Sequence, residues 1–236
     1  MTDLAVPICG KDVDQFTAQI KCAKAAGAQV LELRADYLTE LNVKSLRKVI
    51  KSAKATDLPV IVTCRDQSQG GMNNWPLQLR IEILIEALKS GADFIDCEYE
   101  NFLIDDVSRK ISQGLSENSR ARLILSAHNF NGKFPDLNKL YENILSVCSE
   151  AIPKLVYTPK HINDCFDAFD LLGRSHGNAI ILCMGKAGLI SRLLAKKLGA
   201  LLTFASIDPE KATAPGQVTV EQMKSLYRWD SIDSDT

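Results

Sequence analysis

Eight short apolar runs rich in β-branched residues recur along the chain, and they constrain its fold more than any other feature. The runs start about 22 to 34 residues apart, and the segments between them carry apolar residues three and four positions apart, as at Leu77, Ile81 and Leu84. That spacing is helical, and strands that alternate with helices form parallel sheets. The predicted strands are residues 4–9, 30–33, 60–64, 94–97, 123–126, 155–157, 179–184 and 201–204.

Eight strand–helix units favour an α/β fold in which the sheet closes into a single-domain (β/α)8 TIM barrel. The chain has 236 residues, and such barrels typically have about 250. The alternative is an open, doubly wound sheet, which usually carries a glycine-rich phosphate-binding turn after its first strand. Residues 9–12 read CGKD instead. We expect a barrel domain over residues 1–229, its last helix opened by a capping box at Thr219 and Gln222, and a polar tail or linker over residues 230–236.

Composition and charge exclude several classes of protein. The net charge is -1, and Lys and Arg are dispersed, so no basic patch is available for nucleic acid. The longest apolar runs fall well short of the roughly 20 residues of a membrane span, and the N-terminus lacks the pattern of a signal peptide. The seven cysteines show no C-x-x-C spacing and are expected to be reduced core residues. We therefore expect a cytoplasmic protein that binds neither nucleic acid nor membranes.

Charged residues interrupt the apolar runs near their carboxyl ends, where TIM barrels carry their active sites. Because alternate strand residues share a face, Glu32 and Arg34 should point to one side, as should Asp96 and Glu98. Arg65 follows the third strand in the same way. Buried charges are costly unless they are paired, so these residues predict an ion-pair network, a polar ligand or both. For Asp96 and Glu98, a purely structural network is as good an interpretation as a functional one.

Lys154 and His128 are the candidates for covalent and proton-transfer chemistry. Lys154 precedes the sixth apolar run, where desolvation or a nearby cation would make its amine nucleophilic. His128 follows the fifth run and could move a proton. A structural interpretation exists for each, since Lys154 could extend its ammonium group to solvent and an isolated histidine is more often structural. Together with arginines that could hold a carboxylate, they suggest Schiff-base lyase chemistry, with Lys186 as a rival nucleophile.

Two later segments could bind a ligand. Residues 183–192 join the seventh strand to a helix, and the helix N-terminus together with Arg192 would favour an anion. The spacing of Gly185 and Gly188 fits neither a P-loop nor a dinucleotide motif. Residues 213–217 follow the eighth strand, and this tight loop could close over a ligand with the side chains of Thr213 and Gln217.

Taken in order, these segments resemble the type I 3-dehydroquinate dehydratase family over nearly the whole chain. The resemblance is carried by ELRAD at 32–36, TCR at 63–65 with GG at 70–71, DCE at 96–98, SAHNF at 126–130, IPKL at 152–155, residues 184–192 and APGQ at 214–217. Residues 227–232 resemble the junction in fused enzymes where a shikimate dehydrogenase domain follows. The chain is compatible with a dehydratase domain of such a fusion.

The resemblance implies a shikimate-pathway enzyme that uses no cofactor or metal and removes water from 3-dehydroquinate by syn elimination, giving 3-dehydroshikimate. Lys154 would form the Schiff base with the C3 ketone, His128 would take the C2 proton, and Arg192 would hold the carboxylate. Dimers occur in the family, so a homodimer is one expected assembly. The residues that would bind the hydroxyl groups are Glu32, Arg34, Arg65, Thr213 and Gln217, and those that would supply apolar walls are Met184 and Phe204.

Gln69 departs from the family pattern, which usually places at this position a Glu that pairs with the catalytic histidine. An amide can orient His128 by a hydrogen bond, but it cannot stabilise an imidazolium as a carboxylate does. We expect activity to be kept, with a lower pKa of His128. Two alternatives stay open on the same fold. One is a Schiff-base aldolase whose phosphate site would include Arg192, and the other, motivated by Gln69, is a binding or regulatory module that leaves its ligand unchanged.

Overall fold

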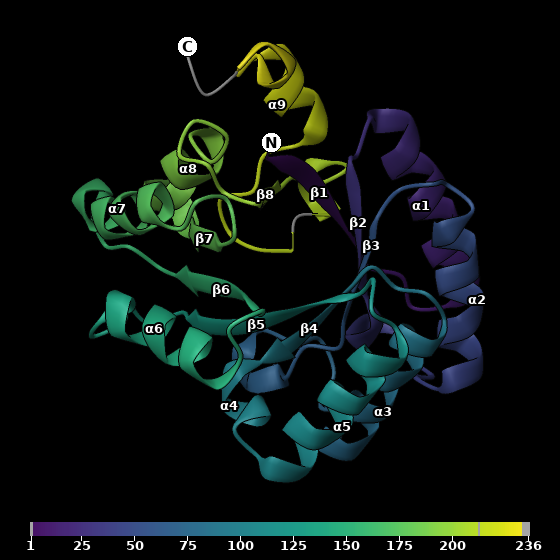
Figure 1. The fold of residues 1–236 in the computed structure, drawn as a ribbon. Coiled ribbons are helices and arrows are strands. Elements are labelled where there is room, and N and C mark those ends of the chain that lie inside the picture. The colour runs from purple at the N-terminus through teal and green to yellow at the C-terminus, as the bar shows by residue number, and fades with distance from the viewer. Residues whose placement is uncertain (1, 212, 233–236) are drawn as a thin grey trace.

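The computed structural model of the protein describes residues 2–211 and 213–232. In these residues eight parallel strands form one sheet, in the order β7-β6-β5-β4-β3-β2-β1-β8. Figure 1 shows the strands around a centre and the helices as an outer ring. The predicted TIM barrel is therefore confirmed. The strands are β1 (Asp3–Ile8), β2 (Val30–Arg34), β3 (Val60–Thr63), β4 (Phe94–Glu98), β5 (Arg122–Asn129), β6 (Ile152–Tyr157), β7 (Ile180–Cys183) and β8 (Leu202–Phe204).

The helices alternate with these strands as the periodicity predicts. Asp12 caps the first of them by accepting a hydrogen bond from the backbone N–H of Gln15, and the predicted capping box of Thr219 and Gln222 opens the last. The helices are α1 (Val13–Ala26), α2 (Val43–Lys54), α3 (Leu77–Lys89), α4 (Tyr99–Phe102), α5 (Asp105–Glu117), α6 (Leu137–Val147), α7 (Phe166–Arg174), α8 (Gly185–Leu193) and α9 (Val220–Ser225). Short 3-10 turns are η1 (Ala35–Tyr37), η2 (Gln67–Gln69), η3 (Ile162–Cys165), η4 (Pro209–Lys211) and η5 (Trp229–Ser231).

The barrel has a seam between β7 and β8. Among the described residues, neighbouring strands pair everywhere else in the ring, but no ladder joins these two. One backbone hydrogen bond crosses near the seam, from the N–H of Leu201 to the carbonyl of Ala179, at 2.9 Å. The sheet is therefore a nearly closed barrel with two edges that lie next to each other.

Alternate strand residues divide between two apolar cores, as expected for a period of two. Ile61, Ile124 and Ile152 belong to a cluster inside the barrel, whereas Leu31 and Val62 belong to the larger cluster between the sheet and the helices. The same alternation carries the polar residues predicted at the strand ends to the inside. The interior is therefore apolar at one end of the barrel and charged at the other.

Strand register sets the polar residues of neighbouring strands side by side. Arg34 lies beside Thr63, Thr63 lies beside Asp96, and Ser126 lies beside Lys154. Because parallel strands align their carboxyl ends at one face of a barrel, these side chains converge there. The fold therefore assembles the charged end of the interior from β2 to β6.

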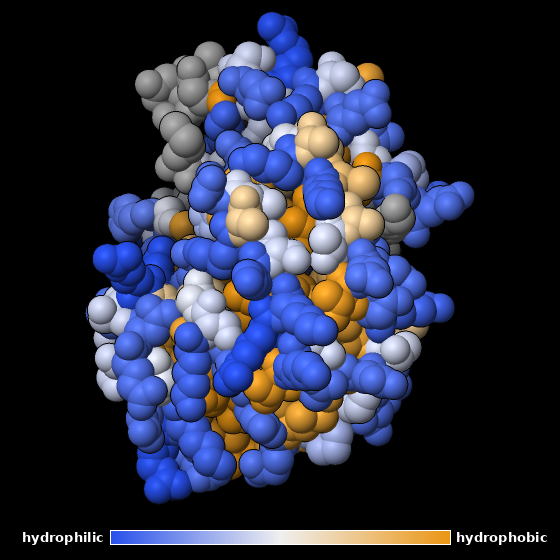
Figure 2. All heavy atoms as spheres, turned by 90° about the vertical axis from the view of Figure 1, so that its right-hand side faces the viewer, coloured by the Kyte–Doolittle hydropathy of each residue, from blue (hydrophilic) through white to orange (hydrophobic). Residues whose placement is uncertain are grey.

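The outer surface, the helices and the cysteines can be compared with the expectations from composition. Figure 2 shows the α1 and α2 side of the molecule, mostly covered by hydrophilic side chains, and none of the helices in the described part of the chain has the length and apolar character to cross a membrane. The seven cysteines, all within the described ranges, are free thiols.

The chain beyond α9 is described as far as residue 232. Trp229 is buried and belongs to η5. Of the predicted tail, residues 233–236 lie outside the described residues.

The interior cluster allows a direct test of the packing. Ile61 is fully buried inside the barrel, whereas Ile162 is 49% exposed on η3. Ile61→Ala should lower the free energy of unfolding by about 2 to 5 kcal/mol, because it removes buried methyl groups and leaves a cavity. Ile162→Ala, the matched control, should change it by less than about 0.5 kcal/mol. Urea unfolding of both variants checks the prediction, and equal effects would contradict the close packing of Ile61 inside the barrel.

Candidate active site

A pocket of about 150 Å³ opens at the carboxyl end of the strands. A larger hollow of about 500 Å³ lies on the outside, between α2, α3 and α5, but the predicted reactive residues do not line it. The pocket at the strand ends is lined by Glu32, Arg34, Arg65, Gln69, Gly70, His128, Phe130, Lys154, Val156, Leu182, Met184, Arg192, Phe204, Thr213, Ala214 and Gln217. The structure thus brings together all the predicted pocket residues, from segments far apart in the sequence.

Lys154 extends from β6 into the middle of this pocket. Its side chain is buried, and its Nζ donates hydrogen bonds to Asp96 Oδ2 at 2.8 Å and to Glu32 Oε1 at 3.2 Å. The same Nζ lies 4.7 Å from the centroid of the Phe204 ring, close enough for a cation–π contact. The alternative that Lys154 extends to solvent is wrong, because the amine is held inside the barrel by two carboxylates and an aromatic ring.

Arg65 binds the same carboxylate as Lys154 and two further polar side chains inside the barrel. Its guanidinium donates to Asp96 Oδ2 at 2.7 Å, to Glu98 Oε1 at 2.9 Å and to Ser126 Oγ at 2.6 Å. Ser126 in turn donates to Asp96 Oδ1 at 2.6 Å. Asp96 therefore accepts hydrogen bonds from Arg65, Ser126 and Lys154 at once, and it belongs to both the structural network and the lysine site.

Arg80 extends the network from α3 and was not predicted from the sequence. It donates to Glu98 Oε2 at 3.0 Å and also to Asp66, while the backbone N–H of Asp66 donates to Glu98 Oε1 at 2.9 Å. Asn101 Nδ2 also donates to Glu98 Oε2 at 2.9 Å, so Glu98 accepts hydrogen bonds from two arginines, an asparagine and a backbone amide. Glu98 is not among the residues that line the pocket, and it contacts Arg65, which is.

Asp36 organises the other side of the pocket. Arg34 donates to both of its carboxylate oxygens, at 2.9 and 2.8 Å, and the backbone N–H groups of Arg65 and Met72 donate to it at 3.3 and 3.0 Å. The fully buried Asp36 therefore fixes Arg34 and joins the ends of β2 and β3 to the loop of residues 70–72. In the sequence, Asp36 shares by alternation the side of Glu32 and Arg34, and it ends the ELRAD segment.

His128 lies at the end of β5, in contact with Gln69. Its Nδ1 is 3.1 Å from Gln69 Oε1, and its backbone N–H donates to the same oxygen at 3.2 Å. Burial, and next the positive charges of Arg65 and Lys154, lower the pKa of His128 well below its ordinary value of 6.5. A neutral histidine with one free ring nitrogen is a competent proton acceptor. The predicted contact between Gln69 and His128 is present.

Arg192 differs from the other buried cations of the site. Its side chain is 2% exposed, and burial lowers its pKa to about 10. Its Nε has no hydrogen-bond partner, and no ion pair to a described residue accompanies it, whereas Arg34, Arg65 and Lys154 each contact a carboxylate. A buried unpaired guanidinium that lines a pocket is suited to an anionic ligand.

The remaining predicted residues complete the walls. Thr213 and Gln217 contact each other, with the backbone N–H of Thr213 donating to Gln217 Oε1 at 2.9 Å and Gln217 Nε2 donating to Thr213 Oγ1 at 3.1 Å. Met184 and Phe204 are buried apolar residues of the lining. Phe130, which sequence reasoning missed because it follows the strand as a lone aromatic, stacks beside His128 with ring centroids 6.3 Å apart.

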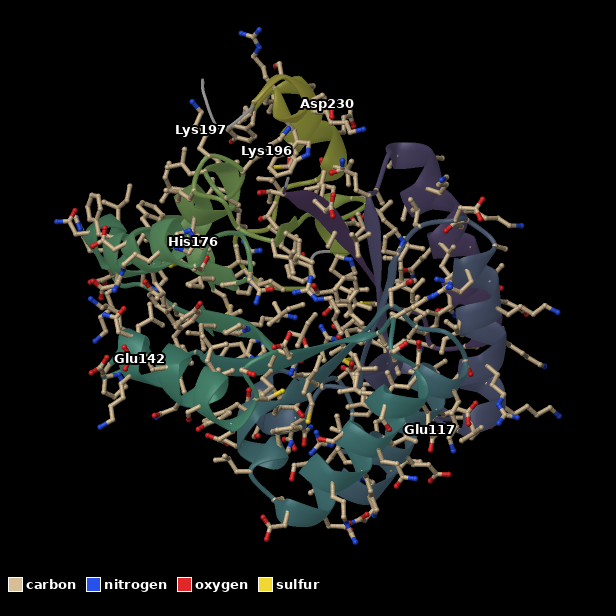
Figure 3. The ribbon with its side chains drawn as sticks, in the orientation of Figure 1. Glu117, Glu142, His176, Lys196, Lys197 and Asp230 are labelled. Atoms are coloured by element: carbon tan, nitrogen blue, oxygen red, sulfur yellow. The ribbon has the colours of Figure 1, made fainter. Side chains whose placement is uncertain are left out.

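The rival candidates lie elsewhere. Lys186 is exposed at the start of α8 and does not belong to the pocket lining, so it is not a competing nucleophile there. His161 and His176 are also exposed, and Figure 3 shows His176 in the outer ring, near α7. Within residues 2–211 and 213–232, no group of three His, Cys, Asp or Glu side chains is arranged to hold a metal ion.

The comparison with known proteins extends over nearly the whole chain. Residues 4–234 match the family model described as type I 3-dehydroquinase. The 3-dehydroquinate dehydratase of Coxiella burnetii is 32% identical over 95% of this chain and 92% of that protein. The enzyme of the same name from Methanococcus maripaludis is 30% identical over 95% of this chain and 98% of that protein. A bifunctional 3-dehydroquinate dehydratase/shikimate dehydrogenase of Arabidopsis thaliana is 29% identical over 99% of this chain, which spans 38% of that relative.

Solved structures agree in fold. The 3-dehydroquinate dehydratase of Aquifex aeolicus is 27% identical, with a TM-score of 0.81 over 98% of this chain and 99% of that one. A type I 3-dehydroquinate dehydratase of Clostridium difficile, at 24% identity, has a TM-score of 0.83 over 98% of this chain and 94% of that one. The second likeness adds evidence for the fold alone.

The carboxylate of Asp96 makes the free energy of unfolding depend on pH in the acid range. Burial opposes ionisation of Asp96, but Arg65 and Lys154 outweigh it and hold its pKa well below the ordinary 3.8. A carboxyl with a depressed pKa contributes stability that is fully present above about pH 3.8 and is lost as the pH falls below that value. Asp96→Asn should therefore lower the free energy of unfolding by about 3 kcal/mol near pH 7 and flatten its decline below about pH 4.

Urea unfolding across this pH range measures both effects. Asp106→Asn is the matched control, because Asp106 pairs with Arg109 and Lys110 on the surface of α5, where ion pairs contribute little. The control should follow the wild-type curve. An Asp96→Asn curve parallel to the wild type in acid would contradict the role given to this carboxylate.

Proposed function

The chain belongs to the type I 3-dehydroquinase family, and from this we propose that it dehydrates 3-dehydroquinate through a Schiff base on Lys154. The observation that carries the proposal is the position of the Lys154 amine, buried in the pocket and hydrogen-bonded to Asp96 and Glu32. His128 and Arg192, which has no ion pair to a described residue, line the same pocket. An amine, a neutral base and a cation for a carboxylate are the groups that this elimination requires.

The first step joins enzyme and substrate. Lys154 Nζ, after passing one ammonium proton to a neighbouring carboxylate, attacks the C3 carbonyl carbon. A second proton from the nitrogen and the proton returned by the carboxylate leave with the carbonyl oxygen as water, so that a protonated C=N bond replaces the C=O bond. The resulting iminium draws electrons from the neighbouring carbon and acidifies the C2 proton. Phe204 and Met184 line the pocket and would exclude water from the imine.

The elimination follows from the position of His128. Its free ring nitrogen takes the C2 proton, and the electron pair of that C–H bond moves into the iminium to give an enamine. The enamine then expels the C1 hydroxyl group, which takes the proton back from His128 and leaves as water. Hydrolysis of the conjugated imine releases 3-dehydroshikimate and restores the Lys154 amine. Each proton is accounted for without a cofactor.

The polar residues around the lysine would orient the substrate. Arg192 would pair with its carboxylate, and Glu32, Arg34 and Arg65 would bind its hydroxyl groups. Thr213 and Gln217 contact each other in this structure, so a ligand that uses their side chains would replace these contacts. Groups in these positions would turn the C2 proton toward His128, which is the geometric condition for a fast proton transfer.

Borohydride reduction tests the proposal. Incubation with 3-dehydroquinate and borohydride should leave a reduced adduct that intact-mass spectrometry detects and peptide mapping assigns to Lys154. Lys154→Ala should give no adduct, and Lys186→Ala, the control at the exposed lysine, should give the wild-type result. If the wild type forms no adduct and shows no absorbance from the dehydrated product, the proposal is overturned in favour of a binding module. Turnover of a phosphorylated sugar instead would favour an aldolase.

Arg192 provides a second prediction, which separates binding from folding. Arg192→Met should lower kcat/KM by roughly 10²-fold or more, because a buried charge partner of the substrate carboxylate is lost. The same change should keep or raise the free energy of unfolding, since the free protein no longer buries an unpaired cation. Arg65→Met, the contrast, should destabilise the protein, because Asp96 and Glu98 lose their partner. Steady-state kinetics and urea unfolding measure the two effects.

Two finer expectations accompany the function. We propose a cytoplasmic location, which the free cysteines support, because thiols persist in a reducing compartment. A homodimer also stays a prediction, and analytical ultracentrifugation would measure it. Nucleic acid has no part in the proposed reaction, whose partner is a small carboxylic acid.

A further inference from the structure

Lys154 lies between two carboxylates that differ in their other partners. Asp96, at 2.8 Å from Nζ, also forms an ion pair with Arg65. Glu32, at 3.2 Å from Nζ, has no second cation, since Lys154 is its only ion-pair partner in the part of the chain that the structure describes. Arg34 acts on Glu32 only through its longer-range charge, because its guanidinium is already bound to a carboxylate of its own.

This difference matters when the lysine loses a proton. A free amine is needed for attack on a ketone, so one ammonium proton has to leave Lys154 first. If that proton went to solvent, Asp96 would keep Arg65 as its counterion, whereas Glu32, which is 4% exposed, would remain charged without a paired cation. A buried unpaired carboxylate is costly. Transfer of the proton to Glu32 leaves two neutral groups and avoids that cost.

The other groups near the amine are less suited to accept this proton. Burial opposes ionisation of Asp96, but Arg65 and Lys154 outweigh it and hold the pKa of that carboxyl well below its ordinary value. Asp96 is also absent from the residues that line the pocket. His128 lines the pocket, yet no hydrogen bond between described residues joins it to the lysine. Glu32 both contacts the amine and lines the pocket.

We propose that Glu32 is a catalytic residue that takes the ammonium proton of Lys154 before the attack and returns it to the departing oxygen. Thr63 Oγ1 donates to Glu32 Oε1 at 2.9 Å, and this hydrogen bond fixes the acceptor oxygen beside Nζ. The role rests on the proposed function. It gives Glu32 a proton transfer in addition to the contact with a substrate hydroxyl group that is expected there.

The atoms and charges balance across imine formation. One ammonium proton moves from Nζ to Glu32, and the neutral amine adds to the C3 carbonyl carbon while the C=O electron pair moves to the oxygen. A second nitrogen proton passes to that oxygen, which becomes the hydroxyl group of a carbinolamine. Glu32 then protonates this hydroxyl group, the C–O bond breaks, and water leaves as the nitrogen lone pair forms the iminium. Glu32 ends ionised beside a cation, as it began.

Rapid-quench borohydride trapping at saturating 3-dehydroquinate tests this step, with intact mass as the measure of adduct. Glu32→Gln keeps the length and the acceptor oxygen of the side chain but cannot carry the proton, and it should slow adduct formation roughly 10²-fold. Glu142→Gln is the matched control. Glu142 is exposed on α6, and Figure 3 shows it in the outer ring, so this variant should form the adduct at the wild-type rate.

Chemical rescue separates a proton carrier from a side chain that only binds the substrate or supplies charge. Glu32→Ala removes the carboxylate and leaves space beside Nζ. Added formate is a carboxylate small enough to enter that space, and it should raise the rate of imine formation roughly tenfold or more. Nitrate has a similar size and the same charge but is a far weaker base, so it should not.

Two results would overturn the role of Glu32. One is a Glu32→Gln protein that forms the adduct at the wild-type rate, and the other is a Glu32→Ala protein that nitrate rescues as well as formate does. If Glu32→Gln does not fold, Glu32→Asp takes its place, because its carboxylate is one methylene group further from Nζ, and a wild-type rate there would equally contradict the transfer. Absence of adduct on the wild type would instead end the proposed reaction, so the two failures are distinguishable.

Discussion

The site depends on one carboxylate that serves two cations. Asp96 accepts hydrogen bonds from Arg65 and from Lys154, and Ser126 satisfies its other oxygen. Three strands contribute to this contact, because Asp96, Ser126 and Lys154 lie on β4, β5 and β6. Glu98 also pairs with Arg65 and Glu32 also pairs with Lys154, but Asp96 contacts both cations, so its loss would leave a buried arginine and a buried lysine side by side with one carboxylate fewer, which is costly. The proposed nucleophile, Lys154, is thus held by an interaction that also offsets the burial of Arg65.

Most of the fold could be predicted from the sequence. Strands buried on both faces give continuous apolar runs, and all eight runs coincide with strands. The predicted ends of strands were less accurate where an apolar run gives way to polar residues. The fifth strand was expected to end at Ser126, yet it continues to Asn129, because backbone pairing with β6 does not depend on side-chain polarity. Alternation along the strands also correctly placed Glu32 and Asp96 inside the barrel.

Prediction of the site was limited by contacts between distant segments. Arg80 lies in a helix, where an arginine usually marks a solvent-facing side, and only the folded chain shows that it reaches Glu98. Alternation put Asp36 on the same face as Arg34, but its hydrogen bonds to the backbone of Arg65 and Met72 depend on the geometry of the loops after β2 and β3. The contact of Gln69 with His128 was anticipated only through a family resemblance, since no local pattern links residues 59 positions apart.

The seam between β7 and β8 is the place in the described ring where no ladder joins neighbouring strands. The strands from β2 to β6, which carry the lysine, the histidine and their ion pairs, are joined by uninterrupted ladders. Met184, Arg192 and Phe204, together with the segment of Thr213 and Gln217, lie in the last units, at the sheet's two edges. A sheet edge can yield without breaking an inner ladder. We therefore expect the half of the pocket from β2 to β6 to hold the proposed reacting groups in place, and the half beside the seam to adjust more readily to the shape of a ligand.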